Sequence, residues 1–278
     1  MEKDLIKELL KSDSKSDSNK KILDSFEKVD SFRTIFTLVN MLEDKEVGIK
    51  AALILGKVKS EKVFFPLMDV FTKGRPAARK NAAWVLGELG DKRAVPALVE
   101  VLKNKYLDIN LLQNVAQALG KIKSEVSIVP LIKVLKNKEI RWSVAQALGE
   151  FKSKVVLRAL IAHLDYQDTG IRIGVVWALS ALKSEEAIIS LVKALDDPNE
   201  EVVKGASWAL RQFSSERALN NLVEEFVKAT PKVRENLIHI FSKFGSGNTI
   251  QRLQELSSNV SEEIRSDLKE AIRAIKER

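Results

Sequence analysis

The chain has 278 residues, of which 45% are hydrophobic and 30% charged, and its formal net charge is +8. It has no cysteine and only two histidines, which excludes disulfides and thiolate metal sites and predicts neither a metal nor a cofactor. No apolar run approaches the roughly 18 residues of a membrane helix and the lysine-rich start is unlike a signal peptide, so we expect a cytoplasmic protein without a membrane segment.

Residues 1–19 are predicted to form a short helix followed by a polar linker. The stretch "KDLIKELLK" is amphipathic, with Leu5, Ile6, Leu9 and Leu10 on one side. The stretch "KSDSKSDSNK", residues 11–20, has the low-complexity polar composition of a flexible linker. We expect the apolar side of the helix either to cap the open end of the domain that follows or to dock to a partner.

From about residue 20 onward, one segment of about 31 residues repeats along the chain. Its most regular position, which we call the anchor, holds Gly56, Gly87, Gly120, Gly149, Ser180, Arg211, Ser242 and Arg273. The predicted units lie near residues 20–44, 45–74, 75–107, 108–136, 137–167, 168–198, 199–229 and 230–260, with a C-terminal cap at 261–278. This regular period predicts a single repeat domain over residues 20–278.

Each unit is predicted to contain two helices. The first helix has apolar residues nine, five, two and one before the anchor, which is helical spacing. Capping residues precede the first helix at Asp44, Asp108, Asn137, Asp168, Asn199, Thr230 and Ser261, and the second at Ser60, Asp91, Ser124, Ser153, Ser184, Ser215 and Ser246. Prolines such as Pro66, Pro96 and Pro130 predict that the second helix opens with a short separate turn. Because no unit can bury its apolar stripe alone, we expect an all-α chain stacked into an α-solenoid.

One unit carries a family resemblance. The stretch "AARKNAAWVLGELGDKRAVPALVEVL", residues 77–102, resembles HEAT repeats of the phycobilisome-lyase type, and the resemblance extends over about residues 20–278. It implies a right-handed superhelix of about seven to eight two-helix HEAT-like repeats, with the first helix of each repeat lining the concave surface. The family's arginine eight residues before the anchor is present at Arg79, Arg141, Arg172, Arg234 and Arg265. We interpret these arginines as a structural ladder between units, interrupted at Gly48, Leu112 and Val203.

All four tryptophans are predicted to face away from the core. At about 100° per residue, the positions three and seven before the anchor lie on the side of the first helix opposite its apolar stripe. Trp84, Trp177 and Trp208 occupy the first of these positions and Trp142 the second. Amides and small residues lie between them, a composition typical of surfaces that bind partners.

The sequence therefore predicts a non-enzymatic scaffold or adaptor that binds an extended protein or peptide partner in a concave, tryptophan-lined groove. Gly174 and Gly205, each one turn before a tryptophan, are interpreted as making room for a ligand, although two of the tryptophans could instead cover each other and Ile173. The predicted groove residues are Trp84, Trp142, Trp177, Trp208, Lys80, Asn81, Asn114, Gln117, Gln146, Ile173, Gly174, Lys204, Gly205, Gln212, Asn236 and His239.

Two alternatives stay open at this point. The basic charge and the pair Trp84 and Glu88, one turn apart, suggest nucleic-acid binding or the activity of a HEAT-like alkylpurine DNA glycosylase. The mixed charges along the predicted groove, however, are unlike a phosphate-binding track. The family resemblance also allows a lyase-like subunit that holds an aromatic cofactor against the tryptophans. No phosphate loop, nucleophile elbow or carboxylate cluster predicts a catalytic residue.

Overall fold

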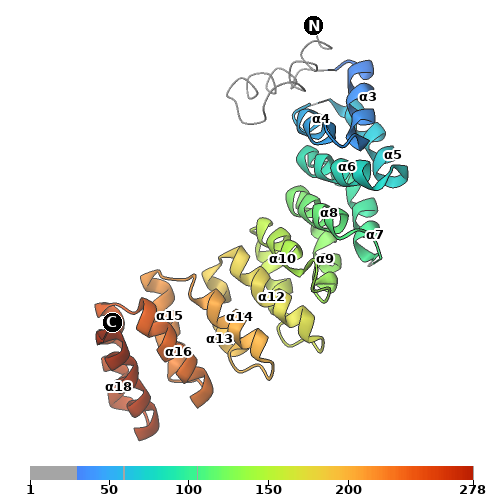
Figure 1. Ribbon diagram of the computed structural model, residues 1–278. Helices are drawn as coiled ribbons and strands as arrows, with labels where there is room; N and C mark the ends of the chain where they lie inside the picture. Colours follow the sequence, from blue (N-terminus) through green and yellow to red (C-terminus); the bar gives the residue numbers. More distant parts are fainter. Residues whose placement is uncertain (1–29, 59, 105, 278) are drawn as a thin grey trace. The chain divides into compact units, whose positions relative to one another are not determined.

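The computed structural model describes residues 30–277 except 59 and 105, and these residues form helices and turns without a strand (Figure 1). The short helix and linker predicted within residues 1–19 lie outside the described residues. The α-helices are α3 (Phe32–Asn40), α4 (Gly48–Leu55), α5 (Phe64–Lys73), α6 (Pro76–Leu89), α7 (Val95–Lys103), α8 (Ile109–Ile122), α9 (Ile128–Val134), α10 (Arg141–Glu150), α11 (Lys154–Ile161), α12 (Thr169–Leu182), α13 (Ile188–Ala194), α14 (Glu200–Leu210), α15 (Glu216–Phe226), α16 (Pro231–Phe244), α17 (Gly247–Leu256) and α18 (Glu262–Lys276).

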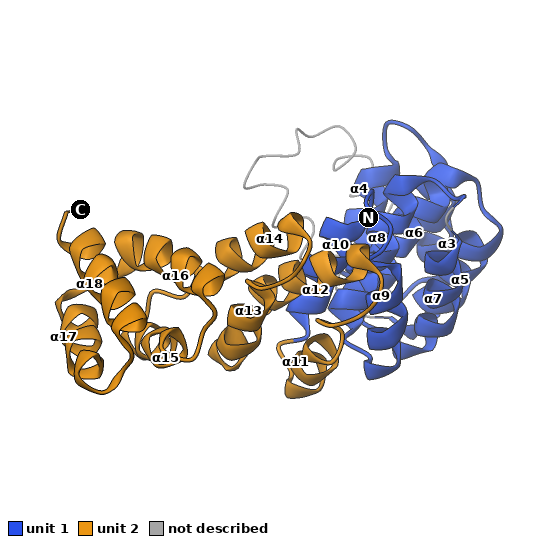
Figure 2. Cartoon of the chain, turned by 90° about the horizontal axis from the view of Figure 1, so that it is seen from below, with its two compact units in different colours: residues 1–151 blue, residues 152–278 orange. Residues whose placement is uncertain are grey.

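The chain forms two compact units, unit 1 over residues 1–151 and unit 2 over residues 152–278 (Figure 2). In unit 1, α4, α6, α8 and α10 pack side by side in one layer, which we call the A layer. The helices α3, α5, α7 and α9 form the second layer, the B layer, in which α3 packs on α5 and α7 on α9. Unit 2 repeats this plan, with α12, α14, α16 and α18 in its A layer and α13, α15 and α17 in its B layer. The chain is thus an α-solenoid of two-helix repeats, as predicted.

The apolar positions read from the repeat form the core between the two layers. The column five residues before the anchor has no exposed surface at any of its eight members, which are Ala51, Ala82, Val115, Val144, Val175, Ala206, Leu237 and Leu268. Burying a side chain the size of valine or leucine contributes about 1.5–3 kcal/mol, and this column recurs in every repeat. The predicted register of the first helices is therefore confirmed.

Capping side chains begin the helices where the sequence predicts them. Asp108 and Asp168 each accept a hydrogen bond from the backbone N–H three residues ahead, at 3.0 Å. Asp44 accepts the N–H groups of Val47 and Glu46, and these bonds lower the pKa of its carboxyl. Short 3₁₀ turns then open several second helices before their prolines, for example η4 (Lys92–Ala94) ahead of α7.

The serines four residues after the anchor differ in the caps they make. Ser246 accepts the N–H of Thr249, and the Thr249 hydroxyl accepts the N–H of Ser246, so the two form a capping box. Ser184 occupies the same repeat position but caps no backbone N–H with its side chain. Replacing Ser246 with Ala is therefore expected to lower the free energy of unfolding by about 1 kcal/mol, whereas Ser184→Ala has little effect. Urea denaturation followed by circular dichroism measures both, and equal losses would contradict the assignment.

The predicted arginine ladder joins neighbouring repeats. Arg79 donates to the carbonyl of Phe71 at 2.9 Å, and Arg141 donates to that of Leu135 at 2.8 Å. Phe71 lies near the end of α5, and Leu135 directly follows α9. Each of these helices closes the repeat that precedes the arginine. Because carbonyls at a helix C-terminus lack intrahelical partners, the guanidinium groups satisfy backbone acceptors that would otherwise be left without a bond.

Candidate binding groove on the A layer

A pocket of about 390 Å³ lies on the A layer of unit 1, and three successive helices contribute three residues each to it. Its lining consists of Ile49, Ala52 and Leu53 from α4, Lys80, Asn81 and Trp84 from α6, and Asn110, Gln113 and Asn114 from α8. Lys80, Asn81, Trp84 and Asn114 are predicted groove residues, and the structure brings these four together. The other five are not among the predicted groove residues, although Ile49 and Gln113 lie seven before the anchor, the position that holds Trp142.

Trp84 forms the wall of this pocket rather than part of the core. Its side chain is partly exposed, while its neighbours Ala83 and Val85 are fully buried. The ammonium of Lys121 lies 5.3 Å from the centre of the indole ring and forms an ion pair with Glu88. A cation over an aromatic face is attracted to the ring and holds it in place. The carboxylate of Glu88, which the sequence analysis paired with Trp84, is therefore engaged by a lysine.

Two of the three asparagines in the pocket also connect repeats. Asn81 donates its side-chain N–H to the carbonyl of Leu42 at 2.8 Å, and Asn114 donates to that of Lys80 at 3.0 Å. These bonds fix the orientation of both amides, a structural role the sequence did not predict. A side-chain amide has two N–H donors and an oxygen, so each asparagine can still present one N–H and its oxygen to a ligand.

Unit 2 carries the other two predicted groove tryptophans, Trp177 and Trp208. Trp208 on α14 is 45% exposed, and Trp177 on α12 is partly exposed. A methyl group built on Gly205 would lie 3.3 Å from Val176 Cγ1 and 3.4 Å from Trp177 Nε1. The small size of Gly205 thus lets Trp177 pack against α14, which gives this glycine a structural reason besides the predicted space for a ligand.

Two predicted groove residues of unit 2, Ile173 and Gly174, are buried instead of lying on the surface. Ile173 is only 5% exposed and Gly174 is buried. The reason is that α12 packs against both α11 and α14, which leaves little of its surface outside the core of unit 2. These two residues therefore belong to the packing between helices.

The remaining predicted groove residues lie at the surface of their units. Gln117 on α8 and both Trp142 and Gln146 on α10 are exposed in unit 1. In unit 2, Lys204, Gln212 and His239 are exposed, and Lys204 pairs with Glu200. Asn236 is half-buried and donates to the carbonyl of Lys232 on its own helix, α16.

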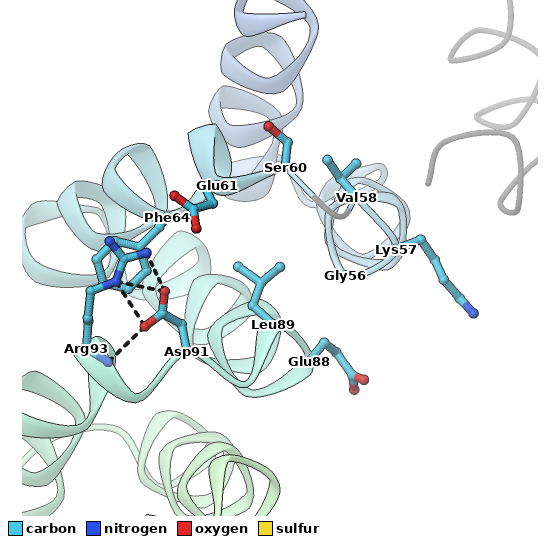
Figure 3. A pocket seen from close by; sticks show the side chains of 10 residues that line it. All are labelled: Gly56, Lys57, Val58, Ser60, Glu61, Phe64, Glu88, Leu89, Asp91 and Arg93. Atoms are coloured by element: carbon cyan, nitrogen blue, oxygen red, sulfur yellow. Dashed lines mark hydrogen bonds and ion pairs between the residues drawn. The ribbon is translucent and has the colours of Figure 1, made fainter. Parts of the chain in front are cut away.

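A larger pocket in unit 1, about 510 Å³, lies where α4 and α6 end (Figure 3). Figure 3 shows Glu61, Asp91 and Arg93 gathered on one side of it, while Lys57 and Glu88 point away from them. Hydrogen bonds from Arg93 lower the pKa of Asp91, and the same guanidinium lies 4.2 Å above the ring of Phe64. Because its main charged groups bind one another, this pocket is a weaker candidate for a binding site than the groove around Trp84.

The described part of the chain carries neither a metal-binding cluster nor a membrane-spanning helix. Within residues 30–277, no three His, Cys, Asp or Glu side chains lie together in a way that could hold a metal ion. In the same part of the chain, every buried side-chain nitrogen or oxygen has a hydrogen-bond partner. No helix of the described residues is long and apolar enough to cross a membrane.

Comparison with known proteins supports this architecture. A family model of HEAT repeats matches residues 66–139 and 128–211, which together span more than half of the chain. Crystal structures of Kap121p and of a mutant form of it are similar over 99% of this chain and 38% of theirs, at 14% identity, with TM-scores of 0.53 and 0.52. The complex of CpcE and CpcF of phycocyanin lyase from Nostoc sp. PCC7120 aligns with 75% of this chain and 92% of its own, at 22% identity and a TM-score of 0.38. A search of curated proteins finds no match.

Proposed function

Since the chain belongs to the HEAT-repeat family, we propose that it is a non-enzymatic scaffold that binds an extended peptide segment of a partner protein in the A-layer groove of unit 1. Solenoids of stacked repeats characteristically use extended surfaces to bind other proteins. The observation that carries the proposal is the pocket around Trp84, where three helices contribute apolar and amide side chains to one concave site. Its volume of about 390 Å³ lies within the range of ligand-binding pockets.

The apolar part of the pocket supports a side-chain binding role. Ile49 is 64% exposed and Leu53 is 37% exposed, and both lie beside the partly exposed Trp84. Large apolar side chains that cluster at the surface gain free energy when a ligand removes them from water, about 25 cal/mol for each Å² buried. An aliphatic or aromatic side chain of the partner is the group that fits this surface.

The polar part supports an extended main chain. A peptide without secondary structure needs partners for its own N–H and C=O groups, because burying these groups without hydrogen bonds costs free energy. Asn110, Gln113 and the two oriented asparagines form a row of amides along α6 and α8, and amides both donate and accept. The groove therefore offers hydrogen bonds to the backbone of a peptide and a pocket to one of its side chains.

The exposed residues of unit 2 supply a second contact in this proposal. Trp208 lies one turn after Lys204 on α14, and His239 is exposed on α16, which packs against α14. We infer that a partner engages Trp208 as a separate anchor. Since Trp177 packs against Gly205, it contributes to stability as well.

The test starts from a random peptide library displayed on phage, selected against the full chain and depleted against a Trp84→Ala variant. Fluorescence anisotropy of the selected peptides measures their affinity. Trp84→Ala is expected to weaken binding at least about thirtyfold, the effect of losing a binding hot spot worth about 2 kcal/mol. The melting temperature should change little, because Trp84 is not in the core. Tyr106→Ala removes an aromatic that is 86% exposed and outside the pocket, and serves as the matched control.

Two results would contradict the proposal. The first is a selection that yields no peptide whose affinity depends on Trp84. The second is tight binding of single-stranded or duplex DNA that depends on Trp84 and falls steeply between about 50 and 200 mM salt, as phosphate recognition requires. That second result would favour the nucleic-acid alternative.

A further inference from the structure

The B layer of unit 1 carries a row of exposed apolar side chains. Phe65, Pro96 and Val129 lie nine residues after the anchor on α5, α7 and α9, and all three are exposed. Phe36 occupies the equivalent place on α3, because the buried Ile35, Leu38 and Leu42 of that segment correspond to Phe64, Leu67 and Phe71 of the next. We call Phe36, Phe65, Pro96 and Val129 the B stripe.

Neighbouring side chains widen the B stripe. Phe32 is 59% exposed and stacks on Phe36, with ring centres 6.1 Å apart. Val126, just before α9, is 73% exposed. Arg93, just before α7, contacts the neighbouring helix α5, since its guanidinium lies 4.2 Å from the ring of Phe64 and 5.8 Å from that of Phe65. Four consecutive repeats thus present apolar surface at one helix position.

Unit 2 shows that the repeat itself does not require this surface. The same position holds Arg158 on α11, Ile189 on α13 and Asn220 on α15, so a single apolar residue stands between two polar ones. Scattered apolar residues are normal at a protein surface, whereas a continuous apolar row is typical of an interaction site. The row in unit 1 therefore has a cause other than folding.

Charged residues flank the B stripe in an ordered way. Arg33, Lys62 and Arg93 lie six residues after the equivalent anchor, on the side of the row nearer the start of each helix. Asp69 on α5 and Glu100 on α7 lie thirteen after it, on the other side, whereas α9 carries Lys133 at this position. Lys62 pairs with Asp30, Arg93 with Asp91, Asp69 with Lys73 and Glu100 with Lys103. Exposed pairs of this kind contribute about 0–1 kcal/mol, so a partner's charges can replace them at little cost.

The chemistry of this surface selects a helical partner over an extended one. Except for Asn40 at the end of α3, the positions of the row and its flanks carry no side-chain amide, and the backbone groups of these helices already bond within their own helices. An extended peptide would lose water here without gaining main-chain hydrogen bonds. An α-helix satisfies its own backbone, and two of its turns cover about 10 Å, close to the spacing of packed neighbouring helices.

From these observations we infer that the B stripe docks an amphipathic α-helix of a partner protein across α3, α5, α7 and α9. The apolar face of that helix contacts the B stripe about every seven residues. Its acidic flank faces Arg33, Lys62 and Arg93, and its basic flank faces Asp69 and Glu100. This surface belongs to the B helices, whereas the peptide groove belongs to the A helices, so the two sites can bind separate segments.

The probe is a designed, fluorescein-labelled amphipathic peptide of about 24 residues, long enough to cross four helices. It has leucines on one face, glutamates along one flank and lysines along the other. Its binding to the full chain is measured by fluorescence anisotropy. Phe65→Ser is expected to weaken binding at least about tenfold, and Phe36→Ser with Phe65→Ser to weaken it further. Ile189→Ser, at the same repeat position in unit 2, and Trp84→Ala should leave the affinity unchanged.

Further peptides and variants test which molecule binds the B stripe. A peptide of the same composition with its leucines scrambled should not bind, and one with lysines on both flanks should bind more weakly. Equal binding of the scrambled peptide, or no effect of Phe65→Ser and of Val129→Ser, would overturn the inference.

A different ligand of the B stripe would also overturn it. If sedimentation shows a dimer of this chain that Phe65→Ser dissociates, the B stripe binds a second copy. A higher peptide affinity after Leu5→Ser and Leu9→Ser would assign the B stripe to the chain's own N-terminal segment instead. Loss of peptide binding to Trp84→Ala, with Phe65→Ser unaffected, would support the A-layer groove alone.

Discussion

Replacing Arg172 with methionine is expected to lower the free energy of unfolding of unit 2 by about 3–5 kcal/mol, the cost of removing one partner of a buried ion pair. Arg172 is 9% exposed, and its Nε and Nη2 atoms lie 2.7 and 3.0 Å from the two carboxylate oxygens of Asp197. Its Nη1 also donates to the carbonyls of Tyr166 and Gln167. The variant leaves a buried carboxylate without its counter-ion, as well as backbone acceptors without a donor.

Urea denaturation followed by circular dichroism measures this loss. Arg158→Met on α11 is the matched control, because Arg158 is an exposed arginine of the same unit and its replacement is expected to change stability by less than about 0.5 kcal/mol. Replacing Arg172 with methionine and Asp197 with leucine together should recover part of the loss, since the isolated charge is then gone. An Arg172→Met variant as stable as the unmodified chain would contradict the buried pair.

The same pair predicts how the loss depends on pH. Burial alone raises the pKa of Asp197, but hydrogen bonds from Arg172 and from the N–H of Asn199 outweigh it and hold the pKa below its usual value. The stabilisation by Asp197 is therefore complete above about pH 4 and falls as the pH drops toward the folded-state pKa. Without Arg172, burial raises the pKa of Asp197. In the variant, this carboxyl therefore takes up its proton at a higher pH, and the cost of a buried, unpaired charge disappears there. The stability difference between the two chains should therefore narrow as the pH falls toward about 4 and continue to narrow below it.

Replacing both Gly87 and Gly120 with alanine should separate the A-layer helices of unit 1. A Cβ atom on Gly87 would lie 2.7 Å from the Cα of Ala118, and one on Gly120 would lie 2.8 Å from the Cα of Ala147. These neighbours are backbone atoms of the next helix, which cannot rotate away. Each added methyl is expected to cost about 1–3 kcal/mol by overpacking, although alanine favours the helix by about 0.5–1 kcal/mol.

Thermal unfolding of the two single variants and the double variant measures these costs. Gly247→Ala is the control, because a Cβ there meets no atom within 4 Å, and its melting temperature should stay the same or rise slightly. If Gly87→Ala and Gly120→Ala also raise the melting temperature, then α6, α8 and α10 do not approach as closely as the structure shows.

The sequence by itself determined the helices, because the causes of their ends are local. Asp108 and Asp168 cap an N–H three residues away, and that spacing can be read directly from the chain. The buried column that includes Ala82 and Val115 follows from the helical period in the same way. This arithmetic also predicted that Trp208 faces outward, and its side chain is exposed.

Tertiary structure decided which of these outward positions form a site. The period of one helix cannot reveal that Asn81 bonds Leu42 in an earlier repeat, or that Gly205 accommodates Trp177. Nor does it show that α12 buries Ile173, since that depends on the helices on both of its sides. The pocket around Trp84 and the B stripe both arise from side chains about one repeat apart. How closely such side chains approach is set by the volumes of all the residues between two helices, and these volumes act together only once the helices are packed.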